Sequence, residues 1–168
     1  MAAGKSTAGR LLAARIGYAF ADTDEEISKE TEMSVPQFIE DHGFESFRKM
    51  ERKILRRLAA NGRTVISCGG GLYPTSATAD IFSKGISIFI EVPEEILAKR
   101  ILGNLPAYPK FAKFSSKQEI RKEISSLLLR RIKFYEKCDL QYSPGNASLE
   151  QAAGEIAEKI YLYYNSDE

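Results

Sequence analysis

A lysine and two hydroxyl side chains stand near the start of the chain, in the sequence Gly4-Lys5-Ser6-Thr7. An amphipathic run follows directly, so the free backbone amides at the start of a helix would point toward an anion. In such a loop the lysine binds the β- and γ-phosphates of a nucleotide, and the hydroxyl beside it binds Mg²⁺. The four letters also occur in unrelated proteins, so a phosphate-binding loop needs support from elsewhere in the chain.

Two aspartates provide the next candidate site. Asp22 and Asp24 end the short apolar segment 18–24. At a strand end, one carboxylate can hold Mg²⁺ or its waters while a second orients or deprotonates an alcohol. The alternative is that acidic residues cap the helix that follows, which suits Glu25 and Glu26 better than the two aspartates together.

Three glycines and two arginines complete the set. Gly69, Gly70 and Gly71 end another apolar run. Ordering three glycines costs backbone entropy, so their presence indicates a backbone that must approach a ligand closely. Arg48 and Arg131 lie in helical patterns, and guanidinium groups match a planar carboxylate in bidentate fashion. A solvated helix face explains either arginine when it is taken alone.

Short apolar runs alternate with amphipathic segments along the whole chain. Strands are predicted at residues 18–24, 64–71, 86–92 and 139–143. Capping signals at Ser34, Ser116 and Ser148 begin three of the helices between and after them. This alternation predicts a parallel sheet with helices on both faces, whose strand ends bring the candidate residues together.

Composition limits the possible partners. The chain has 168 residues, of which 43% are hydrophobic, so we expect one domain over residues 1–168. Its 24 basic and 23 acidic residues give a net charge of +1, which indicates a small-molecule partner rather than nucleic acid or a membrane. Without a bilayer-length apolar run or a signal-peptide pattern, a cytoplasmic protein is expected. The single histidine, His42, nearly excludes a histidine triad or multi-histidine metal site.

Taken together, the motifs resemble those of the shikimate kinase family. The resemblance is carried by GKST, DTD, FRKME, GGG and RRIKFYEKCDL, in the expected order and spacing. It implies a P-loop kinase with a three-layer α/β/α fold and a five-stranded parallel sheet. It also implies a substrate-binding region at about residues 23–60 and a lid at about residues 103–116. The implied protein is a monomer that moves the γ-phosphoryl of MgATP to the 3-hydroxyl of shikimate, in aromatic amino-acid biosynthesis.

The resemblance also implies roles for single residues. Lys5 would neutralise phosphate charge, while Ser6 and Asp22 would hold Mg²⁺. Asp24 would bind the substrate hydroxyls and orient or deprotonate the attacking one. The shikimate carboxylate would be bound by Arg48 and Arg131, and the ring would lie against Gly69, Gly70 and Gly71. Further ATP contacts would come from Ala2, Ala3, Gly4, Thr7 and Arg100, the last by stacking on adenine.

The sequence departs from the family pattern at two places. The usual first strand and first loop glycine would fall before Met1, so we expect a chain that starts at an internal methionine and folds poorly or binds ATP weakly. The lid usually carries an Arg-Pro pair, whereas Tyr108-Pro109 stands here, and Lys110 or Lys113 would have to supply the cation.

Two alternatives remain open from the sequence. One is a related kinase for another small polyol acid, such as gluconate, which the altered lid leaves possible. The other is a kinase-like fold that binds without catalysing, for which the missing loop glycine and the lid are the only support.

Overall fold

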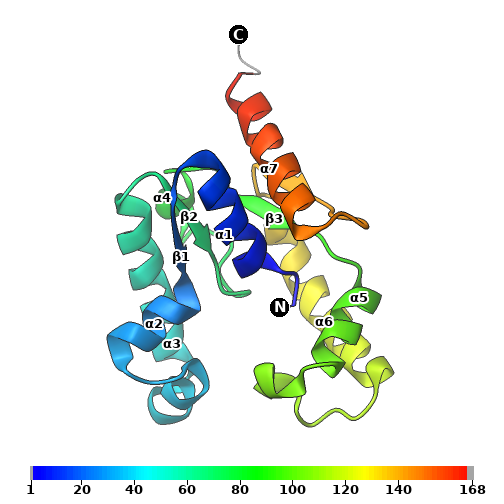
Figure 1. Ribbon diagram of the computed structural model, residues 1–168. Coiled ribbons are helices and arrows are strands. Elements are labelled where there is room, and N and C mark those ends of the chain that lie inside the picture. Colours follow the sequence, from blue (N-terminus) through cyan, green and yellow to red (C-terminus); the bar gives the residue numbers. More distant parts are fainter. Residues whose placement is uncertain (1, 166–168) are drawn as a thin grey trace.

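The computed structural model describes residues 2–165 of the chain (Figure 1). The parallel strands are β1 (Ala19–Asp22), β2 (Thr64–Ser67), β3 (Ile88–Ile90) and β4 (Leu140–Tyr142). The helices are α1 (Lys5–Ile16), α2 (Thr23–Thr31), α3 (Val35–Ala60), α4 (Ala79–Phe82), α5 (Glu94–Leu102), α6 (Lys117–Tyr135) and α7 (Leu149–Tyr164). Two 3-10 helices, η1 (Leu105–Ala107) and η2 (Pro109–Phe111), lie between α5 and α6.

The strands form two parallel pairs. β1 pairs with β2, so that Asp22 lies opposite Ser67, and β3 pairs with β4, so that Ile90 lies opposite Tyr142. Within residues 2–165 no ladder joins one pair to the other, and each strand therefore has a single partner. All four predicted strands and their parallel direction are confirmed, in two small sheets rather than a continuous one.

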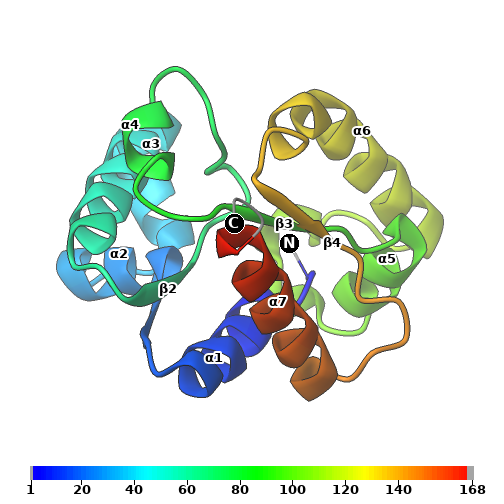
Figure 2. The same cartoon turned by 90° about the horizontal axis from the view of Figure 1, so that it is seen from above.

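Helices surround the strands in three groups. Figure 2 shows α1 and α7 side by side on one side of the strands, in agreement with their extensive packing. α2, α3 and α4 gather beside the first strand pair, and α5 and α6 beside the second. Each group has its own apolar cluster, represented by Ile156 for α1 and α7, Ile54 for α2 and α3, and Ile101 for α5 and α6.

Most predicted helix boundaries are confirmed. Ser34, Ser116 and Ser148 cap α3, α6 and α7, the last two with complete capping boxes. Gly43, with φ 79° and ψ 163°, has a non-helical conformation that favours glycine, and α3 is kinked there into two helical parts. The sequence indicated α2 only in the capping alternative for the acidic residues after β1, and the single turn of α4 was not predicted.

The segment predicted as the lid contains regular secondary structure and a buried anchor. Both 3-10 helices fall within it, and the side chain of Phe111 is 0% exposed, in the apolar cluster formed by α5 and α6. One fully buried aromatic side chain therefore anchors the middle of the segment predicted as the lid.

Two further observations bear on the sequence predictions. None of the helices described is both long and apolar enough to cross a bilayer. The expectation of an internal methionine start concerns Met1, which lies outside the described residues.

Candidate active site

The start of α1 presents backbone amides and a hydroxyl to the strand ends. Gly4 has φ 81° and immediately precedes the helix, so Lys5, Ser6 and Thr7 form its first turn, whose amides have no partner within the helix. Before it, Ala2 has φ 52°, a left-handed conformation that an alanine adopts only with strain. The phosphate-binding loop predicted from GKST thus has the backbone geometry of an anion site.

Ser6 and Asp22 are in direct contact. The Ser6 hydroxyl donates to Asp22 Oδ2 at 2.6 Å and lies 3.2 Å from the Ser67 hydroxyl at the end of β2. Hydroxyl and carboxylate oxygens are the ligands that Mg²⁺ prefers, and it usually takes few of them from the protein. The pair fits such an ion, although no cluster of three or more acidic, His or Cys ligands occurs in residues 2–165.

The other oxygen of Asp22 fixes the second aspartate. Asp22 is the N-cap of α2, and its Oδ1 accepts from the backbone amide of Asp24 at 2.9 Å. The capping alternative considered for acidic residues thus applies to Asp22 itself, in addition to its contact with Ser6. Asp24 is thereby held in the first turn of α2, two residues beyond the end of β1.

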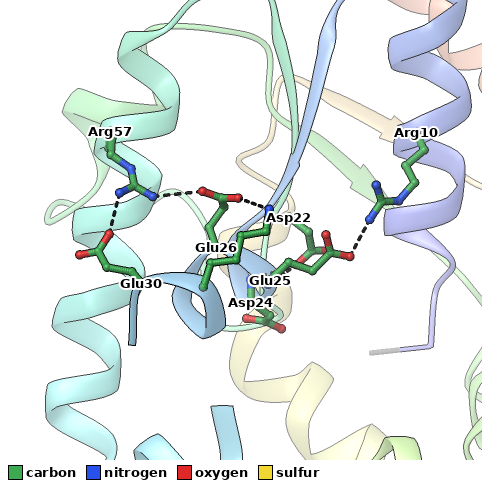
Figure 3. Close-up of polar contacts among 8 residues, drawn as sticks. Arg10, Asp22, Asp24, Glu25, Glu26, Glu30 and Arg57 are labelled. Carbon is green, nitrogen blue, oxygen red and sulfur yellow. Dashed lines mark hydrogen bonds and ion pairs between the residues drawn. The ribbon is translucent and has the colours of Figure 1, made fainter. Parts of the chain in front are cut away.

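Ion pairs hold α2 between its neighbours (Figure 3). Arg57 of α3 contacts Glu26 at 3.1 Å and Glu30 at 2.6 Å, and Arg10 of α1 contacts Glu25 at 2.6 Å. Because these groups are partly or largely exposed, each pair adds little stability, and the pairs link α2 to α1 and α3 at its surface.

Burial changes the proton affinity of Asp24. Loss of solvent raises the pKa of its carboxyl, and the negative charge of Asp22 raises it further, while Lys5 and Arg48 act in the opposite direction. A carboxylate with a raised pKa is a better proton acceptor than an exposed one.

The loop formed by Gly69, Gly70 and Gly71 after β2, called the glycine loop below, adjoins both the aspartates and the arginines. The backbone amide of Gly69 donates at 2.9 Å to the hydroxyl of Thr23, which is fully buried. A Cβ at position 69 would lie 2.7 Å from Glu51 Oε1 and 3.0 Å from Asp24 Oδ1, and a Cβ at position 71 would overlap the Arg48 guanidinium. A side chain at either position would therefore displace neighbouring charged groups of the protein, a reason for glycine that the sequence did not reveal.

Arg48 is fixed by one carboxylate and two rings. Its guanidinium donates to Glu51 and lies 4.5 Å from the Phe44 ring centre and 5.4 Å from that of Phe47. Glu51 is 1% exposed, and burial raises the pKa of its carboxyl while Arg48 opposes the rise. Glu51 was not predicted, although its place three residues after Arg48 in FRKME was the available signal.

Arg131 reaches the same loop from α6. Its Nη1 donates to the Gly70 carbonyl at 2.5 Å, and the Tyr135 hydroxyl donates to the same oxygen at 2.7 Å. The structure thus brings Arg48, Arg131 and the three glycines together, as predicted. Tyr135 was missed, and only its four-residue spacing from Arg131 could have indicated it.

Arg100 lies at a separate cavity beside the start of α1. Its Nη1 donates to the Ala2 carbonyl at 2.9 Å, and both Arg100 and Ala3 line a cavity of about 210 Å³. Ile90, Pro144 and Leu149 complete much of its apolar wall. An apolar hollow with a guanidinium at its edge suits a flat heterocycle, whereas Thr7 is simply exposed.

The lid lysines have partners outside the phosphate-binding loop. Lys110 lies 3.2 Å from Glu123 of α6, and Lys113 lies 5.0 Å from the ring centre of Phe114. Tyr108 packs against the apolar cluster of α5 and α6.

Comparison with known proteins gives a consistent family. A model of the family described as shikimate kinase matches residues 1–161. A shikimate kinase from Aquifex aeolicus (strain VF5) is 34% identical over 161 residues, covering 93% of this chain and 89% of that protein.

Solved structures agree with this assignment. Shikimate kinase from Acinetobacter baumannii, in complex with shikimate, is 26% identical with a TM-score of 0.78, covering 100% of this chain and 90% of that one. Shikimate kinase from Bacteroides thetaiotaomicron has a TM-score of 0.88 at 24% identity, covering 96% and 94%, which supports the fold alone. A gluconokinase from Sinorhizobium meliloti 1021 is more distant, with a TM-score of 0.54, 18% identity and coverage of 100% and 93%. The chain therefore belongs to the shikimate kinase family.

Proposed function

We propose that this protein transfers the γ-phosphoryl group of ATP to the 3-hydroxyl of shikimate. The observation that carries the proposal is the meeting of two different sites at one edge of the strands. Ser6 and Asp22 form an oxygen pair at the start of α1, and Asp24 stands next to the glycine loop that contacts Arg48 and Arg131. A phosphate donor and an acidic polyol would thus lie on either side of Asp24.

Each side chain has a defined part in the proposed reaction. Arg48 and Arg131 bind the carboxylate of shikimate, which fixes the ring so that one hydroxyl faces Asp24. Asp24 accepts the proton of that hydroxyl, and burial raises the pKa of its carboxyl toward the range useful for this step. Lys5, in the first turn of α1, balances the charge that develops on the transferred group.

Magnesium and the nucleotide complete the proposal. Ser6 and Asp22 would hold Mg²⁺, which offsets the negative charge of the phosphates when it is bound. The cavity beside Arg100 would receive the adenine, and the amides of Gly4 to Thr7 the phosphates. A single domain, a cytoplasmic location and a monomeric state stay predictions.

The test is a coupled assay of ADP release by the full chain with MgATP, with and without shikimate. ADP release that requires shikimate supports the proposal, and Arg131→Ala should then raise the KM for shikimate without changing that for ATP. Release with gluconate instead would favour the related kinase. Binding of shikimate without turnover would favour the non-catalytic alternative.

A further inference from the structure

Two donors on one helix share one acceptor in the glycine loop. Arg131 Nη1 and the Tyr135 hydroxyl lie 2.5 and 2.7 Å from the Gly70 carbonyl oxygen. They are four residues apart in α6 and so project from the same face of the helix. A carbonyl oxygen has two lone pairs, so both bonds can exist together.

Aromatic neighbours hold the ring of Tyr135 in the orientation in which its hydroxyl donates to the Gly70 carbonyl. It stacks on Phe89 of β3 with ring centres 4.8 Å apart, and it meets Tyr73 edge to face at 5.7 Å. Tyr73 in turn stacks on Phe134 at 4.7 Å. Burial also raises the pKa of the Tyr135 phenol above its ordinary value, so the hydroxyl remains a donor at neutral pH.

Arg131 has more donors than its described partners use. A guanidinium carries five N–H donors, and the Arg131 side chain donates to the Gly70 carbonyl and also interacts with the Tyr135 hydroxyl. On the proposed function, this group turns toward the substrate carboxylate. That movement weakens its bond to a partly buried carbonyl, and a buried acceptor without a partner is costly.

We propose that Tyr135 is a positioning residue that keeps the Gly70 carbonyl hydrogen-bonded while Arg131 engages the carboxylate of the substrate. The inference rests on the proposed function, because it concerns the arginine that binds shikimate. Without the Tyr135 hydroxyl, Arg131 is the sole side-chain donor to the Gly70 carbonyl. Substrate binding by Arg131 then competes with its hydrogen bond to that carbonyl. The effect therefore falls on the affinity for the acidic substrate.

Two tyrosines in one aromatic cluster allow a matched test. Tyr135→Phe removes the hydroxyl and keeps the ring stack, whereas Tyr73→Phe removes a hydroxyl for which residues 2–165 provide no hydrogen-bond partner. Binding of shikimate is measured by titration calorimetry, and KM and kcat by ADP release. Tyr135→Phe is expected to weaken shikimate up to about tenfold, the factor that one hydrogen bond supplies. Its KM for ATP and its kcat should stay within about twofold, as should every constant of Tyr73→Phe.

A double-mutant cycle separates positioning from general stability. In an Arg131→Ala background the competition no longer exists, so adding Tyr135→Phe should cause no further loss of shikimate affinity. Equal losses in both backgrounds, an unchanged affinity in Tyr135→Phe, or a parallel loss of ATP affinity would each overturn the inference. So would loss of folding in Tyr135→Phe, which would assign the hydroxyl a purely structural role. Failure of the unaltered chain to bind shikimate at all would instead overturn the proposed function, and this inference with it.

Discussion

Several charged side chains of this site occupy space that is free because the residues opposite them are glycines. Gly69 and Gly71 leave room for Arg48, Glu51 and Asp24, so the loop is shaped by its protein neighbours as well as by any ligand. The two arginines also contact the loop differently. The Arg48 guanidinium packs against Gly71, whereas Arg131 donates a hydrogen bond to the Gly70 carbonyl. Their contributions can therefore be separated by substitution.

Gly71→Ala is expected to displace Arg48. The added methyl group would occupy the position of the guanidinium, which must leave its place beside Glu51. Losing a hydrogen-bonded charge contact should raise the KM for shikimate by about 10- to 100-fold, with a much smaller effect on the KM for ATP. Initial rates measure both constants. Gly85→Ala is the matched control, since a Cβ there meets nothing within 4 Å, and similar kinetics for the two variants would contradict the expectation.

Asp24→Asn should lower activity and raise stability. Removing the proton acceptor is expected to lower kcat by about 100- to 10,000-fold. The folded state raises the pKa of Asp24, so it binds more protons than the unfolded state as pH rises from the ordinary carboxyl range through the raised value. Stability of the unaltered chain therefore falls across that window and stays lower above it, and asparagine removes this fall.

Urea unfolding at a series of pH values measures the effect of Asp24→Asn. The free-energy difference between variant and parent should grow with pH across the window and then become constant. Asp80→Asn, which removes an exposed carboxylate and its surface ion pair with Arg56, is the control. A difference that does not depend on pH would show that burial of the Asp24 charge is not the cause.

Among the secondary-structure elements, the lid is joined to α5 and α6 by the side chain of Phe111. Its side chain is fully buried in the cluster that includes Ile101 of α5 and Ile120 of α6. Phe111→Ala should lower the free energy of unfolding by about 3–5 kcal/mol, because it leaves a cavity in a packed core. The same change releases the centre of the lid, so ATP hydrolysis in the absence of shikimate should rise relative to phosphoryl transfer.

Denaturant unfolding and the ratio of the two activities measure the effects of Phe111→Ala. Leu129→Ala provides the comparison, since Leu129 on α6 is 77% exposed and its loss should change stability little. Unfolding at the same denaturant concentration in both variants would mean that Phe111 does not anchor the lid.

The sequence predicted the elements better than the contacts between them. Strand positions follow from the short apolar runs, and the capping boxes of α6 and α7 from Ser-x-x-Glu and Ser-x-x-Gln. α2 was indicated only by the capping alternative, because just Thr23 and Ile27 of its nine residues are buried, and that gives a weak amphipathic pattern.

The site was predictable in its parts and less so in its connections. DTD and GKST were expected at the same edge of the sheet, and Ser6 indeed contacts Asp22. Glu51 and Tyr135 could not be assigned, because a spacing of three or four residues is found throughout helices. Only the fold shows that both side chains face the glycine loop.

Across the whole molecule, the two strand pairs are connected mainly through side chains and helices. α1 packs on α7, and the bonds of Arg131 and Tyr135 to Gly70 tie α6 to the end of β2. The glycine loop is thus part of the connection between the two strand pairs as well as of the proposed substrate site.

Hydrogen exchange should reveal the divided sheet. Every strand in residues 2–165 has one hydrogen-bonded partner, so amides that point away from that partner lack a ladder bond. Within each strand, alternate amides are therefore expected to exchange quickly and slowly, with the slow group at least about tenfold more protected. Residue-resolved exchange by NMR measures this, and uniform protection along β2 and β3 would contradict a sheet divided between them.

The open strand edges of the two strand pairs also affect how readily the protein associates with itself in solution. Four strands that each have an open edge offer four templates on which strands of another molecule can add. Long-range repulsion does little to prevent such encounters, because the net charge is +1 and the isoelectric point is near 7.7. Colloidal stability near neutral pH then depends on the helices that cover the strands, and it improves in buffers well away from the isoelectric point.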